Sequence, residues 1–239
     1  MKAIILCEGT TDLLMIQFVL QYKYGWQYDG FVENTVTNQL IRRNLIRGND
    51  SVEINSCGGI MNIPSKINKI KDKMCNATRQ EEIYNKVIVM IDHDTVSSNQ
   101  EFINQLNDKA GENFETSQLN VWSEWLIESL IFGETNVDLY LGCIPSDNTG
   151  AIETIMLEAL ATDQLEIKLI SDTRDFINGV SNNQNRYLQK ESRRSKAIFN
   201  TYFAIRTPEE KYDERARVLN AYDWKNNEIL NSSFQFLDI

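Results

Sequence analysis

The segment ILCEGTTD, residues 5–12, runs from apolar residues into a carboxylate, a glycine and a second carboxylate four residues later. Its apolar part belongs to KAIILCE, residues 2–8, which predicts a short buried strand ending at the glycine. The next residues, TTDLLMIQFVLQYKYG at 10–25, predict a helix with a threonine as N-cap and an acid in the first turn. The segment therefore predicts a strand, a tight turn and a helix, with Glu8 and Asp12 on either side of the turn.

The same alternation of strand and helix continues to residue 111. SVEINSCGG (51–59) predicts a second strand, and IPSKINKIKDKM (63–74) predicts a lysine-rich amphipathic helix. KVIVMIDHD (86–94) is the clearest buried strand in the chain, and SSNQEFINQLNDKAG (97–111) predicts the helix that follows it. This order predicts an α/β fold with a Rossmann-like core, in which a parallel sheet is flanked by helices.

The pattern beyond residue 115 is less regular. LNVWSEWLIESLIF (119–132) fits either a strand followed by a helix or one amphipathic helix. VDLYLGCIP (137–145) predicts a strand, and TGAIETIMLEALA (149–161) predicts a helix.

The remainder of the chain predicts a mostly helical region to about residue 225, followed by the apolar end SSFQFLDI, which we expect to pack on the core. Because no linker composition interrupts the chain, we predict one domain over residues 1–239. It has a core over about residues 1–160 and a helical C-terminal elaboration over about residues 161–239.

Composition limits the cellular location and the binding partners that we expect for this protein. The four cysteines are scattered without a C-x-x-C pair, which argues against a zinc knuckle or a disulfide framework and predicts a reducing, cytoplasmic location. No segment is apolar for long enough to predict a signal peptide or a membrane span, so no membrane partner is expected. The net charge of −10 disfavours binding to nucleic acid through the overall charge of the protein.

Charge is unevenly distributed, however. Residues 186–225 hold ten Lys and Arg against six Asp and Glu, a net charge of +4. This region fits a solvated pair of charged helices or a local phosphate-binding patch. Within QKESRRSK (189–196), the candidate phosphate contacts are Arg193, Arg194 and Lys196.

Several carboxylates follow predicted strands. Glu8 follows the first, and Asp92 and Asp94 end the strand at 86–94, where alternation points both aspartates in one direction. Ligands of open parallel sheets bind beyond the carboxyl ends of the strands. We therefore expect these acids and Asp12 to converge on one edge of the sheet, where like charges recruit a hard cation such as Mg²⁺ or Mn²⁺.

These residues resemble the Toprim domain, the catalytic module of topoisomerases, bacterial primases and OLD-family nucleases. Its hallmarks, a Glu after the first strand and a D-x-D after a later strand, are matched by Glu8, Asp92 and Asp94. The E-G-x-x-D form with Asp12 is most similar to the OLD nuclease branch and its small stand-alone relatives. The resemblance covers residues 1–111 and extends to IPSDNTGAIETIMLEAL (144–160).

The resemblance implies a Mg²⁺- or Mn²⁺-dependent nuclease with one or two ions, acting on DNA or RNA. It makes Glu8 a metal ligand or the group that activates water, and assigns metal binding to Asp92, Asp94, Asp12 and Glu153. Asp147 lies behind Glu153 as a weaker match, and Lys196 is the candidate lysine near the scissile phosphate.

The chain differs from larger Toprim enzymes. It has no G-x-x-x-x-G-K-[ST] motif, so the ATPase half of full-length OLD nucleases is missing. By analogy, the partners implied are nucleic acid, a separate ABC-type ATPase in an anti-phage defence system, and a second copy in a homo-oligomer.

Other functions compete with the nuclease. A phospho-receiver-like regulatory domain also gathers acids at a sheet edge, and in that case Asp92 would accept the phosphoryl group. A non-catalytic or partner-activated Toprim subunit would agree with the acidic net charge. His93, the only histidine, should point away from its two aspartate neighbours on an alternating strand, which disfavours a direct role for it.

Overall fold

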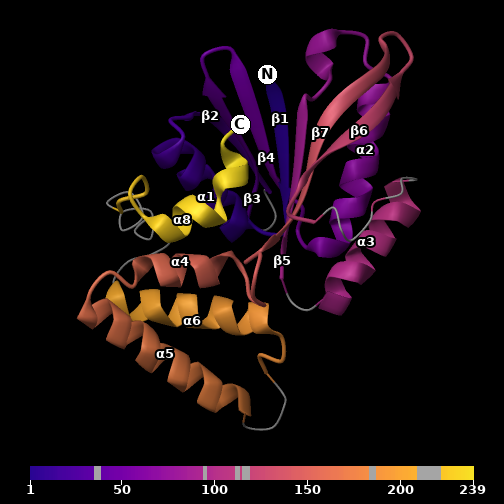
Figure 1. The fold of residues 1–239 in the computed structure, drawn as a ribbon. Coiled ribbons are helices and arrows are strands. Elements are labelled where there is room, and N and C mark those ends of the chain that lie inside the picture. The colour runs from indigo at the N-terminus through magenta and orange to yellow at the C-terminus, as the bar shows by residue number, and fades with distance from the viewer. Residues whose placement is uncertain (35–38, 94–95, 111–113, 115–118, 183–186, 209–221) are drawn as a thin grey trace. The chain divides into compact units, whose positions relative to one another are not determined.

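The computed structural model describes the chain except residues 35–38, 94–95, 111–113, 115–118, 183–186 and 209–221 (Figure 1). Its strands form one sheet in the order β2-β3-β4-β1-β5-β7-β6. Their bounds are β1 Lys2–Cys7, β2 Gln27–Asn34, β3 Gln39–Arg47, β4 Asp50–Ser56, β5 Lys86–Asp92, β6 Trp122–Ser129 and β7 Gly133–Ile144.

The centre of the sheet is parallel, because β1 pairs in parallel with β4 on one side and with β5 on the other. The chain leaves β1 toward β4 and then crosses over β1 to reach β5. Such a reversal of strand order makes the carboxyl end of β1 and its neighbours the usual place for a ligand in an α/β sheet. The predicted α/β fold is confirmed.

Antiparallel hairpins form both edges of the sheet, and the sequence did not predict them. β2 pairs with β3, β3 pairs with β4, and β6 pairs with β7, all antiparallel. The helix expected within residues 119–132 is wrong, because β6 is a strand that buries Trp125 and Ile127 at alternate positions. Its apolar residues fit the period of a helix and that of a strand equally well.

The helices have the bounds α1 Thr10–Phe18, α2 Ile63–Cys75, α3 Val96–Ala110, α4 Ile152–Leu160, α5 Gln164–Asn182, α6 Glu191–Arg206 and α8 Glu228–Ser233. A π-helix, Val19–Lys23, continues α1, and short 3₁₀ helices span Ile60–Asn62, Gln80–Glu82 and Gln235–Leu237. In Figure 1, α2 and α3 lie together beside β5, β6 and β7. Within the described residues, every helix is too short or too polar to span a bilayer.

Alternation along the central strands separates the two faces of the sheet. Ile4 and Leu6 of β1, with Ile91 of β5, enter a buried core that also contains apolar residues of α2 and α3. These helix residues are Ile63, Ile67, Ile70, Met74, Phe102, Ile103 and Leu106. Residues at the intervening positions of each strand belong to the opposite face, beneath α1.

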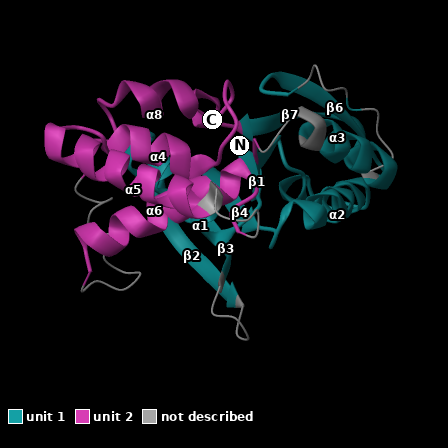
Figure 2. Ribbon diagram, turned by 90° about the horizontal axis from the view of Figure 1, so that it is seen from below, with its two compact units in different colours: residues 1–91, 95–143 teal, residues 92–94, 144–239 magenta. Residues whose placement is uncertain are grey.

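The chain separates into two compact units, coloured in Figure 2. The first contains residues 1–91 and 95–143, and the second contains residues 92–94 and 144–239. In the second unit, α5 packs on α6, and α4 packs on α6 and α8. The apolar C-terminal residues Phe234 and Leu237 are buried, and the packing of this segment on the core stays a prediction. The single domain over residues 1–239 stays a prediction.

Candidate metal centre

Asp92 is the last residue of β5 and is buried. It follows Ile91, which faces the core beneath α2 and α3. Since successive side chains of a strand point to opposite faces, Asp92 points to the other face of the sheet. A carboxylate with a side chain only 5% exposed requires compensating charge, because burial strongly disfavours an isolated ion.

Backbone hydrogen bonds hold the end of β5 against the segment that leads into α4. The His93 amide donates to the carbonyl of Ile144 at 3.1 Å, and the Gly150 amide donates to the carbonyl of His93 at 2.8 Å. Nδ1 of His93 lies 3.0 Å from the carbonyl oxygen of Pro145. His93 thus braces the turn, and the start of α4 has a fixed position relative to Asp92.

The first turn of α4 presents Glu153, which is 2% exposed. Gly150 precedes this turn, and a Cβ there would lie 2.6 Å from Oγ1 of Thr154 and 3.2 Å from Cδ of Pro145. Oγ1 of Thr154 accepts from the Ala151 amide at 3.2 Å and donates to Oγ of Ser195 at 2.8 Å. Only glycine fits this close approach without moving its neighbours.

Lys196 comes from α6 and contacts Asp92 directly. Its Nζ donates to Oδ2 of Asp92 at 2.5 Å. The lysine side chain is 36% exposed, whereas the aspartate side chain is 5% exposed. The hydrogen bond between Thr154 and Ser195 fixes α6 next to α4, one residue before this lysine. Lys196 was a candidate from the sequence, although no spacing tied it to Asp92.

Asp12 lies in the first turn of α1 and is 5% exposed. Its Oδ2 accepts a hydrogen bond from the Gly9 amide at 2.7 Å, and the Leu13 amide donates to the Gly9 carbonyl at 3.2 Å. A carboxylate here is stabilised by the partial positive charge at the start of a helix. Glu153 occupies the same kind of position in α4.

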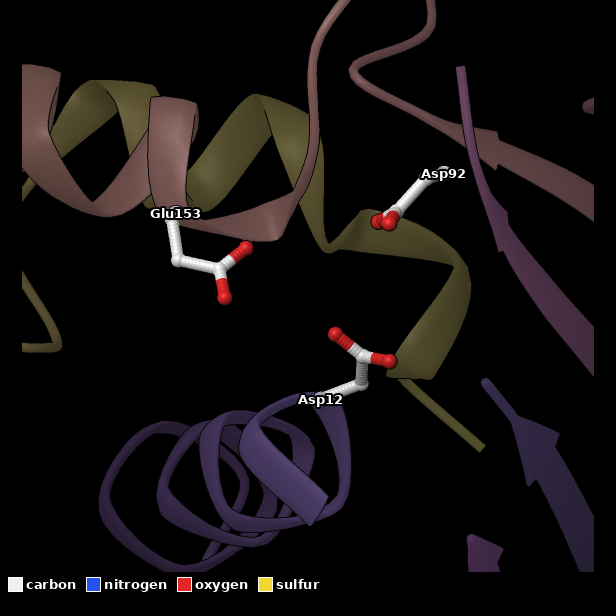
Figure 3. A group of neighbouring side chains, drawn as sticks. All are labelled: Asp12, Asp92 and Glu153. Atoms are coloured by element: carbon white, nitrogen blue, oxygen red, sulfur yellow. The ribbon is translucent and has the colours of Figure 1, made fainter. Parts of the chain in front are cut away.

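Asp12, Asp92 and Glu153 are neighbours (Figure 3), and each offers a carboxylate oxygen within 4.8 Å of the others. Oxygen ligands lie about 2.0–2.1 Å from a bound Mg²⁺, so pairs of them are about 3–4 Å apart. The three buried carboxylates therefore fit one hard divalent cation after small adjustments. Three carboxylates this close together disfavour one another's ionised forms, and a bound cation would relieve that repulsion.

The structure does not bring Glu8 into this group, contrary to the expected convergence of the acids. β1 and β5 are in register at Cys7 and Met90, so Glu8 follows at the level of Ile91 and one position before Asp92. Its charge, after burial, contributes to raising the pKa of the Cys57 thiol to about 11 and that of Cys143 to about 12. Both cysteines belong to the core beneath α2 and α3. Asp94 lies outside the described residues.

The other candidates have separate environments. Arg194 pairs with Glu191 one turn earlier and donates to the Leu188 carbonyl at 3.0 Å, so it organises the start of α6. Arg193 is exposed. Asp147 is exposed and accepts a hydrogen bond from Ser146 at 3.1 Å. Gly150 and Thr154 were not predicted as positioning residues, although a glycine directly before a helix is a usable signal.

The fold and this group define an α/β protein with a buried cluster of carboxylates near the carboxyl end of β5, a central strand of its sheet. A family model described as "Protein of unknown function (DUF3226)" matches residues 2–237, and the chain belongs to that family. A comparison with curated proteins found no match.

Among solved structures, the chain is similar to "hypothetical protein PH0156 from Pyrococcus horikoshii OT3". The two share 13% sequence identity, with a TM-score of 0.47, over 99% of this chain and 98% of that chain.

Proposed function

We propose that the protein is a metal-dependent phosphodiester hydrolase, a nuclease that acts on DNA or RNA with Mg²⁺ or Mn²⁺. The observation that carries this proposal is the group of three buried carboxylates with a lysine on one of them. Carboxylate oxygens alone, without histidine or cysteine, favour hard cations over zinc. The Toprim resemblance of EGTTD and DHD supports the same chemistry.

The residues have distinct roles in this proposal. Asp12, Asp92 and Glu153 would hold the ion, which supplies Lewis-acid stabilisation of the charge on a phosphoryl group. Lys196 orients Asp92 and places a positive charge where a phosphate oxygen would benefit from it. Glu8 lies outside the carboxylate group, which favours the second role that the resemblance offered, activation of water, over metal ligation.

The proposal commits to one ion for these three ligands. A second ion would need further acidic ligands, and Asp94 is the candidate that the sequence supplies. The ABC-type ATPase partner, the homo-oligomer and the role in defence stay predictions.

The direct test is cleavage of plasmid DNA, single-stranded DNA and total tRNA, each with Mg²⁺, Mn²⁺ or EDTA. We expect metal-dependent cleavage that falls by at least about 10³-fold in Glu153→Gln, because loss of a ligand removes the ion. Glu158→Gln is the matched control, since Glu158 is exposed on the same helix. It should cleave like the wild type and show that α4 tolerates the change from Glu to Gln.

Two results would contradict the hydrolase. One is cleavage that persists undiminished in EDTA or in Glu153→Gln. The other is a wild-type protein that binds the metal but cleaves none of the three substrates. Stable labelling of Asp92 by an acyl-phosphate donor would instead support the receiver-like alternative.

A further inference from the structure

The lysine-rich helix α2 has no role in the carboxylate site. It carries four lysines and one aspartate, a net charge of +3, whereas the rest of the chain carries −13. Its buried stripe, Ile63, Ile67, Ile70 and Met74, packs into the core. Among the described helices, only α6 has an equal net charge, and three of its four basic residues, Arg194, Lys196 and Arg206, pair with acids.

Three of the four lysines share one face of α2. Lys66, Lys69 and Lys73 are separated by three and four residues, so they lie within about 60° around the helix axis. All three are exposed, and none forms an ion pair with an acidic group that the structure describes. Within the described part of the chain, this lysine face lacks the neutralising partners that a solvated charged helix usually carries.

The lysine face runs from one end of the parallel strands to the other. At the first end, the charges of Lys66 and Glu8 both act on the thiol of Cys57, which follows β4. At the other end, Nζ of Lys73 lies 5.5 Å from the ring centroid of Tyr84, and Nζ of Lys2 lies 4.7 Å from the same ring. Burial and the charge of Lys73 lower the pKa of Lys2, whereas the charges of Glu53, Glu82 and Glu81 raise it.

We propose that the lysine face of α2, formed by Lys66, Lys69 and Lys73, binds the phosphate backbone of a nucleic acid strand. The choice of nucleic acid as the polyanion rests on the proposed function. From Lys66 to Lys73 the helix rises about 10 Å, and a DNA strand carries one phosphate per about 3.4 Å of helix axis. The face therefore matches about three successive phosphates.

The test is the salt dependence of binding, measured by fluorescence anisotropy in EDTA so that no cleavage interferes. Labelled single-stranded DNA, duplex DNA and RNA of one sequence are titrated with protein between about 50 and 200 mM KCl. Lys66→Gln, Lys69→Gln and Lys73→Gln are combined in one variant. The control combines Lys109→Gln, Lys168→Gln and Lys225→Gln, three exposed lysines on other elements, and has the same net charge.

We expect the α2 variant to bind at least about tenfold more weakly at the lowest salt concentration. Its slope of log K against log[salt] should be smaller by about 2 to 3, the value for three lost phosphate contacts. The control should keep the wild-type slope. Unchanged binding in the α2 variant would overturn the inference, and so would equal losses in both variants, which would indicate a bulk charge effect.

Circular dichroism of both variants excludes misfolding as the cause. Failure of this inference is distinguishable from failure of the hydrolase. Lysine-dependent binding without any cleavage by the wild type would keep the lysine face and remove the hydrolase. If the wild type cleaves with metal and the α2 variant binds nucleic acid fully, the hydrolase would stand and the lysine face would be removed. A further titration uses vesicles of anionic lipid. If the α2 variant loses binding to these vesicles but keeps binding to nucleic acid, the lysine face belongs to a membrane contact and the proposal for nucleic acid is overturned.

Discussion

The ends of β1 and β5 look alike in the sequence and differ in the structure. Each strand runs through buried apolar residues into an acid, Glu8 in one case and Asp92 in the other. Asp92 is buried, paired with Lys196 and grouped with two further carboxylates. Glu8 is half-buried and acts on two thiols of the core beneath α2 and α3.

Register explains this difference. Cys7 pairs with Met90, so Glu8 is level with Ile91 rather than with Asp92. Level residues in neighbouring strands point to the same face, and a shift of one residue reverses that direction. A carboxylate at the end of a strand is therefore insufficient to predict a site, because pairing decides which face it reaches.

The largest expected effect separates metal binding from cleavage. Glu153→Gln should lose both metal binding and cleavage, with an affinity for divalent cations that is lower by at least about 100-fold. Replacing a residue that only hydrogen-bonds to a metal ligand lowers the affinity by about 10–100-fold, and replacing the ligand itself should cost more. Glu8→Gln should lose cleavage but keep metal affinity within about threefold, because Glu8 lies outside the group. Calorimetric titration with Mn²⁺ beside the cleavage assay measures both. Equal loss of metal by the two variants would remove the distinction between the strand ends.

The next effect concerns Lys196. Lys196→Met should lower cleavage by about 10–100-fold, because Asp92 loses its orienting partner. Divalent affinity should not fall, since a competing positive charge is removed. Without metal, the variant should be less stable by about 1–3 kcal/mol, because the buried Asp92 loses the ammonium that pairs with it.

Thermal unfolding in EDTA and in saturating Mg²⁺ measures the stability of Lys196→Met. The loss should shrink when the ion is present, and an equal loss in both conditions would contradict this account. Lys168→Met, at an exposed pair with Asp172, should change little in either condition.

Asp12, Asp92 and Glu153, the acids that lie together, were all named from the sequence and the resemblance, but Glu8 was expected to join them. Runs of apolar residues, with glycines between them, predicted strands β1, β4, β5 and β7 and helices α1, α2, α3 and α4. The acids near the strand ends were visible in the sequence as Glu8, Asp12, Asp92 and Asp94. The hairpin β2–β3 was missed because its strands, QYDGFVEN and QLIRRNLIR, mix charged with apolar residues. Several of these apolar side chains are exposed, so the strands lack the buried apolar run that marks β1 and β5.

The pairing of Lys196 with Asp92 could not be derived from sequence either. It depends on how α6 packs on α4, which a hydrogen bond between Thr154 and Ser195 helps to fix across 41 residues. Local sequence patterns do not predict contacts between residues so far apart in the chain. The register that excludes Glu8 is likewise a property of strand pairing.

A smaller effect is expected from the turn that supports the end of β5. Gly150→Ala places a Cβ against Thr154 and Pro145, and should destabilise the protein by about 1–3 kcal/mol. It should also weaken metal binding, because Glu153 follows this turn. Chemical denaturation and metal titration test both effects. Gly179→Ala, where a Cβ meets no atom within 4 Å, should not destabilise the protein. A Gly150→Ala variant as stable as that control would contradict the close approach.

The smallest effect concerns the thiols near Glu8. Burial raises the pKa of Cys57 from 9.0 to about 11, so the folded state retains a proton that the unfolded state loses. The resulting stability is fully present below about pH 9 and is lost as the pH rises toward 11. Cys57→Ala should flatten this part of the pH dependence, measured by urea unfolding across that range. Wild-type stability that increases with pH over that range would contradict the assignment.

The most direct measurement is a calorimetric titration of Mn²⁺ into the wild type, Asp92→Asn and Asp175→Asn. Asp175 is exposed on α5 and serves as the matched control. The account predicts one ion bound by the wild type and by the control, and affinity reduced by at least about 100-fold in Asp92→Asn. Equal Mn²⁺ binding by all three proteins would contradict a metal centre at Asp12, Asp92 and Glu153.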